Sequence, residues 1–218
     1  MHPRHATSPV RWFALACSLA VLLAATGARA QVWNETGDAG SLIATAQITL
    51  GAGGISTING NLAVPTDVDV YCVLLHATPP AGTFLMALNC FAFHGPGIWL
   101  FNSAGVGIAT NLVCSAGNKT LLAPNVSLPA GNYYVAVAHD GVEPQSAGGA
   151  IWLSNVNAQH APDGPGAAGA LIGWAGTPNV QQPNPYTLTF NVNYFGFCDA
   201  ATPTRKSTWG SLKLRYGY

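Results

Sequence analysis

Short stretches rich in β-branched and aromatic residues recur along this chain, and clusters of Gly, Pro and Asn separate them about every ten residues. Short strands at this spacing are typical of a β-sandwich. The clearer strands are predicted at residues 41–50, 55–62, 67–75, 82–88, 97–101, 119–126, 132–138, 149–153 and 186–194. No window before residue 200 shows a convincing amphipathic helical repeat. The sequence therefore predicts an all-β sandwich, with one long irregular loop at residues 155–185.

The N-terminus has the pattern of a cleavable signal peptide. Arg4 and Arg11 precede an apolar run at residues 12–25, which is shorter and richer in small residues than a stable membrane anchor. Ala28 and Ala30 then stand where signal peptidase accepts small side chains, so a cut is predicted after Ala30. A membrane anchor is the alternative interpretation. Cleavage predicts a protein that is secreted or displayed at the cell surface, with no transmembrane segment left in it.

This cut divides the chain into three predicted regions. They are a signal peptide at residues 1–30, a β-sandwich domain at 31–200, and a linker with a basic and aromatic C-terminal tail at 201–218. The domain is long enough for one well-buried core. The tail resembles short tails of exported bacterial proteins that serve in sorting or surface attachment, and a frayed chain end is the alternative.

The charge distribution excludes one class of partner. The chain has 8 Lys and Arg residues and 8 Asp and Glu residues, and between residues 31 and 204 the only basic one is Lys119. A domain so poor in positive charge cannot neutralise a row of phosphates. Binding of nucleic acid by the main domain is therefore not expected.

Four cysteines remain after the cut, namely Cys72, Cys90, Cys114 and Cys198. An even number of cysteines in an exported protein predicts two disulfides, with three pairings possible. We favour Cys90–Cys114 and Cys72–Cys198, because the first would join neighbouring strand ends and the second would tie the last strand to the core. Four buried free thiols are the alternative. Metal-type cysteine spacing is absent.

Four motifs carry a resemblance to a known family. In chain order they are INGNL at residues 58–62, DVDVY at 67–71, IWLFNSAG at 98–105 and LPAGNYYVAV at 128–137. This succession resembles the bacterial pre-peptidase C-terminal domain over roughly residues 55–140. The resemblance implies a jelly-roll-like antiparallel β-sandwich and a non-catalytic accessory module, of a kind usually appended to secreted enzymes. Some members of that family bind calcium or substrate.

The strand predicted at 67–75 carries the candidate metal ligands. Alternation along a strand puts Asp67, Asp69 and Tyr71 on one face, and Val68 and Val70 on the other. Two carboxylates on one face offer oxygen ligands to calcium, although about six to eight are needed. Carboxylates that hydrogen-bond the start of a strand are the alternative. The sequence thus names Asp67 and Asp69 as calcium candidates, and no other cofactor.

Catalytic signatures are absent from the sequence. No H-E-x-x-H or G-x-S-x-G motif occurs, and the histidines after the predicted cut, His76, His94, His139 and His160, include no closely spaced pair. His139 and Asp140 are adjacent, but neighbouring side chains on a strand point to opposite faces. We therefore expect no enzyme, with a small secreted hydrolase that uses scattered acids as the remote alternative.

Binding is the more credible function. Trp174 lies in the long loop at 155–185, where an indole ring would be available to stack on a sugar, whereas Trp99 and Trp152 lie in apolar strands and are expected in the core. The leading hypothesis is a secreted or surface-displayed module that mediates extracellular interaction or accessory binding. The first alternative is a module that binds carbohydrate or calcium. The partner itself, a cell-surface component or a polysaccharide, is not specified by the sequence.

Overall fold

The computed structural model describes residues 30–90, 95–153, 158–179 and 184–198 of the 218-residue chain. The signal peptide predicted at 1–30, apart from its last residue, lies outside the described residues. So does the tail predicted at 201–218. The domain between them is built almost wholly of strands.

The described residues form one short 3₁₀ helix and fourteen strands. The helix is η1 (Ile43–Thr45). The strands are β1 (Gln31–Asn34), β2 (Gln47–Ile48), β3 (Ile55–Leu62), β4 (Val68–Leu75), β5 (Phe84–Asn89), β6 (Gly97–Phe101), β7 (Gly107–Asn111), β8 (Asn118–Leu122), β9 (Gly131–Ala138), β10 (Val142–Ser146), β11 (Gly149–Ala150), β12 (Gly173–Gly176), β13 (Asn184–Phe190) and β14 (Phe195–Phe197).

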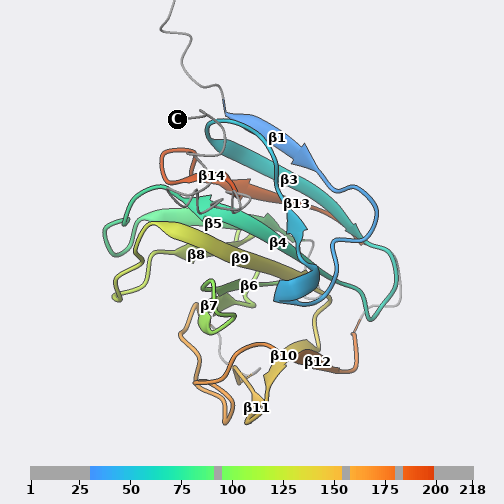
Figure 1. Ribbon diagram of the computed structural model, residues 1–218. Helices are drawn as coiled ribbons and strands as arrows, with labels where there is room; N and C mark the ends of the chain where they lie inside the picture. The colour runs from blue at the N-terminus through green and yellow to red at the C-terminus, as the bar shows by residue number, and fades with distance from the viewer. Residues whose placement is uncertain (1–29, 91–94, 154–157, 180–183, 199–218) are drawn as a thin grey trace, which may run out of the picture.

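Two large sheets form the sandwich. The first, which we call sheet A, has the order β1-β3-β13-β5-β8, and the second, sheet B, has the order β14-β4-β9-β6-β7 with β2 beside β4. A small sheet, β11-β10-β12, lies beyond sheet B, as Figure 1 shows at the bottom of the view. The predicted all-β sandwich is confirmed. Two pairings, β1 with β3 and β2 with β4, are parallel, and the other strand pairings within the two large sheets are antiparallel, as predicted.

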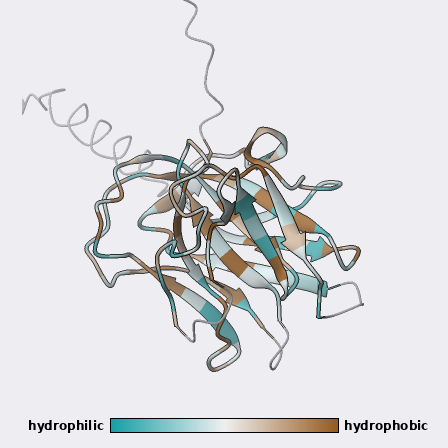
Figure 2. Ribbon diagram, turned by 90° about the horizontal axis from the view of Figure 1, so that it is seen from below, coloured by the Kyte–Doolittle hydropathy of each residue, from teal (hydrophilic) through white to brown (hydrophobic). Residues whose placement is uncertain are grey.

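The main core lies between the two large sheets. Alternate residues of β13 and β3, among them Leu188 and Ile58, are fully buried and face Val73 and Val135 of sheet B. Figure 2 shows the corresponding bands of hydrophobic and hydrophilic residues along the strands. Burial of apolar surface from both sheets is the main term that stabilises a sandwich of this kind.

A second core covers the other face of sheet B. Val68, Val70, Trp99 and Phe101 point away from the main core and pack with Trp152 from the chain after β11. Ring contacts fasten this layer, since Phe101 and Trp152 meet edge to face with centroids 5.5 Å apart. Sheet B is therefore buried on both faces, which explains why every residue of β6 is buried. The outer face of sheet A has no such cover among the described residues.

The predicted strands agree with the structure in some segments and are wrong or too long in others, where the chain forms a turn or a 3₁₀ helix. Residues 55–62 and 97–101 form β3 and β6 as predicted. The strand predicted at 41–50 is wrong, because this stretch forms η1 and then only the two residues of β2. The strand predicted at 186–194 ends at Phe190, where the carbonyl of Asn191 accepts hydrogen bonds from the amides of Tyr194 and Phe195 and begins a turn. β1, β7, β10, β12 and β14 were not predicted.

Two disulfides join the strands. Cys72 of β4 is bonded to Cys198, which follows β14, across a sequence separation of 126 residues. Cys90, at the end of β5, is bonded to Cys114 across a separation of 24 residues. This is the pairing that the sequence analysis favours.

The two disulfides should differ in their contribution to stability, because a longer closed loop removes more entropy from the unfolded chain. Replacing Cys72 and Cys198 by Ala should lower the free energy of unfolding by about 5 kcal/mol, and replacing Cys90 and Cys114 by about 3.5 kcal/mol. Guanidinium unfolding of the two double variants measures the difference. Equal losses would contradict the loop-length argument.

Candidate cation site at one end of the sandwich

Three carboxylates converge at the end of the sandwich where β4 begins. Asp67 directly precedes β4, Asp69 is its second residue, and Asp38 comes from the segment that follows β1. One ligand atom from each of the three lies within 4.8 Å of the others. The parallel pairing of β1 with β3 places this segment there. Because the two strands run in the same direction, the chain leaves β1 after Asn34 at the end of sheet A where β3 also ends, close to the start of β4.

Backbone amides hold the outer carboxylates in place. Asp38 Oδ1 accepts the amide N–H of Gly40 at 2.8 Å, and Asp67 Oδ2 accepts that of Ala63 at 2.6 Å. A fourth acid, Glu35, accepts the amides of Ala39 at 3.2 Å and Asn61 at 2.9 Å. These bonds fix the orientation of each carboxylate before any ligand arrives.

Asp69 is the deepest of the four acids. It points into the main core, and only 1% of its surface is exposed. Its Oδ2 accepts the hydroxyl of Tyr186 at 2.7 Å, and the hydroxyl of Tyr71 lies 2.7 Å from that of Tyr186. By strict donor–acceptor geometry its Oδ1 has no hydrogen-bond partner among the described residues, although the Glu35 carboxyl lies close enough to share a proton with Asp69. An oxygen of this kind is costly to bury, so its presence calls for a ligand or a proton.

The surroundings of Asp69 disfavour its negative charge. Burial raises its pKa from 3.8 to about 8; the hydrogen bond from Tyr186 opposes this rise, while the charges of Glu35 and Asp67 and a hydrogen bond with the Glu35 carboxyl add to it. Burial likewise raises the pKa of the Tyr71 and Tyr186 hydroxyls. Both tyrosines therefore stay protonated and act as hydrogen-bond donors.

The donor set suits a hard cation. Every member offers oxygen, and no histidine or cysteine among the described residues shares the group of Asp38, Asp67 and Asp69. Calcium takes oxygen ligands, largely from carboxylates and carbonyls, whereas zinc sites in proteins use mainly histidine and cysteine. His139 is fully buried, and burial lowers its pKa against the opposing charge of Asp67, so it is a neutral neighbour of this group.

Trp174, the predicted sugar-stacking residue, lies on β12 and is half-buried. Its Nε1 donates to the carbonyl of Ser41 at 2.7 Å, and its ring meets that of Trp99 edge to face at 5.2 Å. These contacts fasten the small sheet onto sheet B. Trp99 and Trp152 are fully buried, as the sequence analysis expects.

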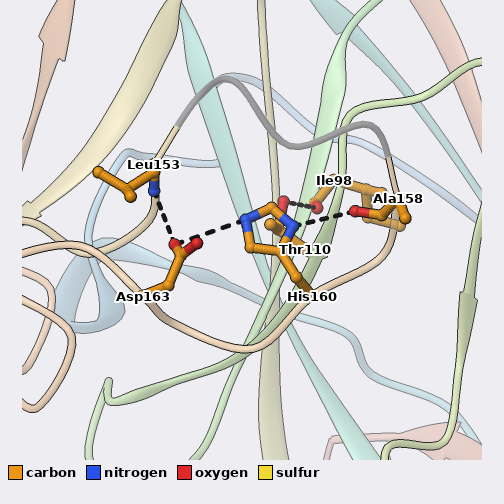
Figure 3. Close-up of polar contacts among 6 residues, drawn as sticks. All are labelled: Ile98, Thr110, Leu153, Ala158, His160 and Asp163. Atoms are coloured by element: carbon orange, nitrogen blue, oxygen red, sulfur yellow. Dashed lines mark hydrogen bonds and ion pairs between the residues drawn. The ribbon is translucent and has the colours of Figure 1, made fainter.

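One histidine and aspartate pair lies in the long segment after β11, and Figure 3 shows its surroundings. His160 Nε2 is 3.6 Å from Asp163 Oδ1, and its Nδ1 lies 2.9 Å from the carbonyl of Ala158. The hydroxyl of Thr110 donates to the carbonyl of Ile98 at 2.9 Å instead of to the imidazole. The side-chain contacts of this pair stay within the segment, and the backbone pairing of His160 with Thr110 fastens the segment to β7. No hydrogen bond among the described residues joins the imidazole to a hydroxyl or thiol.

Two further titratable groups are perturbed by burial. Lys119 is 2% exposed, its Nζ donates to the carbonyl of Gly95 at 2.7 Å, and burial lowers its pKa to about 8. Burial and the charge of Asp140 raise the pKa of Glu143 to about 7. His94, another histidine of the sequence analysis, lies outside the described residues.

The sequence names two of the four clustered acids. Alternation along the strand correctly places Asp67 and Asp69 on one face, and the structure brings them together. Glu35 and Asp38 were missed, because a parallel pairing between distant strands leaves no signal such as a hairpin turn. The closely spaced acids of the segment E-T-G-D at residues 35–38 were the available hint.

The chain matches no protein-family model and no curated protein. Among solved structures it is similar to the pre-peptidase C-terminal domain of a collagenase from Bacillus anthracis, with 10% sequence identity and a TM-score of 0.36. That alignment covers 76% of this chain and 100% of the other. In the part of the chain that the structure describes, no helix has the length and apolar character to cross a membrane.

Gly60 makes room for the two tyrosines under Asp69. A Cβ atom at this position would collide with the hydroxyls of Tyr186 and Tyr71. Gly60→Ala should therefore lower the free energy of unfolding by about 1–3 kcal/mol. Gly173→Ala is the matched control, because a Cβ there would meet no atom within 4 Å. Urea unfolding compares the two, and equal effects would contradict this role for Gly60.

The raised pKa of Asp69 predicts how stability depends on pH without a bound cation. Between its unfolded pKa of 3.8 and its folded pKa of about 8, the folded state holds a proton that the unfolded state has released. Stability from this group is thus full below about pH 4 and is lost as the pH rises through about 8. In a calcium chelator, the melting temperature should fall from about pH 5 to about pH 8, more steeply than in Asp69→Asn. Equal slopes would contradict the prediction; Glu143 adds the same sign of slope to both proteins.

Proposed function

We propose that this chain is an exported, non-catalytic β-sandwich module that binds calcium at Asp38, Asp67 and Asp69, beside the charge of Glu35, and that the ion completes its fold for extracellular binding. The single observation that carries the proposal is Asp69 Oδ1, which is buried, has by strict donor–acceptor geometry no partner among the described residues, and lies in a cluster with the carboxylates of Asp67 and Asp38.

Electrostatics favours a cation in this cluster. Two like charges about 4 Å apart repel by about 4 kcal/mol at the effective dielectric constant of a protein surface. The cluster holds three carboxylates at comparable distances, and Glu35 adds a fourth charge that acts on Asp69. A divalent ion would reverse the sign of these interactions, and it would supply the partner that Asp69 Oδ1 lacks.

The position of the cluster explains what the ion would do for the fold. Asp38 belongs to the segment between β1 and η1, whereas Asp67 directly precedes β4 and Asp69 is its second residue. An ion bound by these three would link the segment that follows the first strand of sheet A to the second strand of sheet B. Because that link exists only in the folded chain, calcium would stabilise the folded state.

Three observations support export and a role without catalysis. Two disulfides suit an oxidising compartment outside the cytoplasm. The His160 and Asp163 pair has backbone partners and no adjacent nucleophile. The buried Lys119 ammonium likewise contacts a backbone carbonyl. Such contacts are those of structural residues, and they favour a binding module over a hydrolase.

Thermal unfolding with and without calcium tests the proposal. At a calcium concentration of about 100 times the dissociation constant, the folded state should gain about 2.7 kcal/mol. For a domain of this size, the melting temperature should then rise by about 5–10 °C. Asp69→Asn and Asp67→Asn should lose most of this rise.

The matched control is Asp163→Asn, which removes a carboxylate far from the cluster in sequence and retains an acceptor for the amide of Leu153. It should keep the full calcium effect. No rise in the wild-type protein, or an equal rise in Asp69→Asn, would contradict the proposed site.

A further inference from the structure

The outer face of sheet A is free of charged side chains. Its five strands contain a single charged residue, Lys119, and this side chain is buried in the interior. The outward positions of the central strands instead carry Asn, Thr, Pro and Ala. The opposite side of the sandwich differs, because the small sheet and Trp152 cover sheet B there. Sheet A thus presents an uncharged surface that is polar along its central row, with exposed apolar side chains at Val32, Phe84 and Leu122.

A row of amide and hydroxyl side chains crosses this face from edge to edge. The register aligns Asn34 of β1 with Asn59 of β3, and Asn59 with Thr187 of β13. On the far side, Asn89 of β5 lies opposite Asn118 of β8. With strands about 4.8 Å apart, a row across five strands is about 19 Å long.

Hydrogen bonds along the row fix the orientation of its central members. Asn59 Nδ2 donates to Asn34 Oδ1 at 3.0 Å, and Asn59 Oδ1 accepts the hydroxyl of Thr187 at 3.1 Å. Asn89 Oδ1 accepts the amide N–H of Thr187 at 2.5 Å. The Nδ2 group of Asn89 is then turned away from Thr187, and its two N–H donors remain for a ligand.

A recess interrupts the row at its centre. The ladder between β13 and β5 ends at Leu188 and Leu88, so the two strands separate beyond this pair. The separation leaves an open recess of about 350 Å³, lined by Asn59, Gly60, Asn89, Pro185, Tyr186 and Thr187. The row therefore combines a shallow depression with oriented donors and acceptors, which is the chemistry that recognises hydroxyl groups.

We propose that the outer face of sheet A binds a neutral polysaccharide, along the row Asn34, Asn59, Thr187, Asn89 and Asn118. A neutral ligand is favoured because the face carries no charge, and its hydroxyl groups can both accept from and donate to the side-chain amides. A polymer is favoured because the row extends across all five strands and the recess is open to solvent at the surface. The surface uses none of the four clustered acids, so this inference goes beyond the proposed calcium site and does not depend on it.

Asn89→Asp is the sharpest test. The new carboxylate can still accept the amide of Thr187, so the fold is retained, but it replaces the two N–H donors with a negative charge. Binding of the full mature protein to suspended cellulose, chitin and starch is measured by depletion from solution, in millimolar calcium. The wild-type protein should bind at least one of these, and Asn89→Asp should weaken that binding about tenfold or more.

Asn125→Asp is the matched control, since it makes the same chemical change at an exposed residue outside all five strands of sheet A. It should bind like the wild-type protein, and both variants should keep the wild-type melting temperature. The inference is overturned if the wild-type protein binds none of the three polymers, if it binds only the acidic polymer polygalacturonate, or if Asn89→Asp binds as tightly as the wild-type protein. Self-association through this face, lost in Asn89→Asp without any binding of polymer, would also overturn it.

Discussion

The structure depends on one carboxylate, Asp69, which is enclosed at the end of a hydrophobic core. Alternation along β4 directs it inward together with Tyr71, Val73 and Leu75. The two tyrosine hydroxyls at this end reach only one of its oxygens. Gly60 supplies the space that these hydroxyls occupy. The other oxygen faces the acids of the surrounding segments, so the end of the sandwich is complete only with a proton or a cation there.

Sheet B separates two hydrophobic cores. Its inner face packs against sheet A and carries Asp69 at one end of the main core. On its outer face Trp99 and Phe101 hold Trp152 and the small sheet, so the long segment after β11 is fastened by ring contacts and by the bridge between Thr110 and His160. Sheet A is then the large sheet whose outer face no described residue covers; its strands carry no exposed charge, and a row of polar side chains crosses that face.

The sequence predicts the parts of this structure that depend on local alternation and turn chemistry. β3, β4 and β6 follow from their own residues, and the two faces of β4 were assigned correctly. The parallel pairing of β1 with β3 was not predictable in this way, because no short turn encodes it, and it is this pairing that brings Glu35 and Asp38 to the site. The partial burial of Trp174 likewise depends on a second core that no local pattern reveals. Asn34 and Asn118 lie far apart in sequence, and only the register of five strands places them in one row.

The most direct measurement is a crystal structure of the protein grown in calcium, with anomalous diffraction used to locate the ion. The account predicts one calcium ion among Asp38, Asp67 and Asp69, with Asp69 Oδ1 as a ligand at about 2.4 Å. A structure in which this oxygen instead bonds to a neighbouring carboxylate through a shared proton, with no anomalous peak in the cluster, would contradict it.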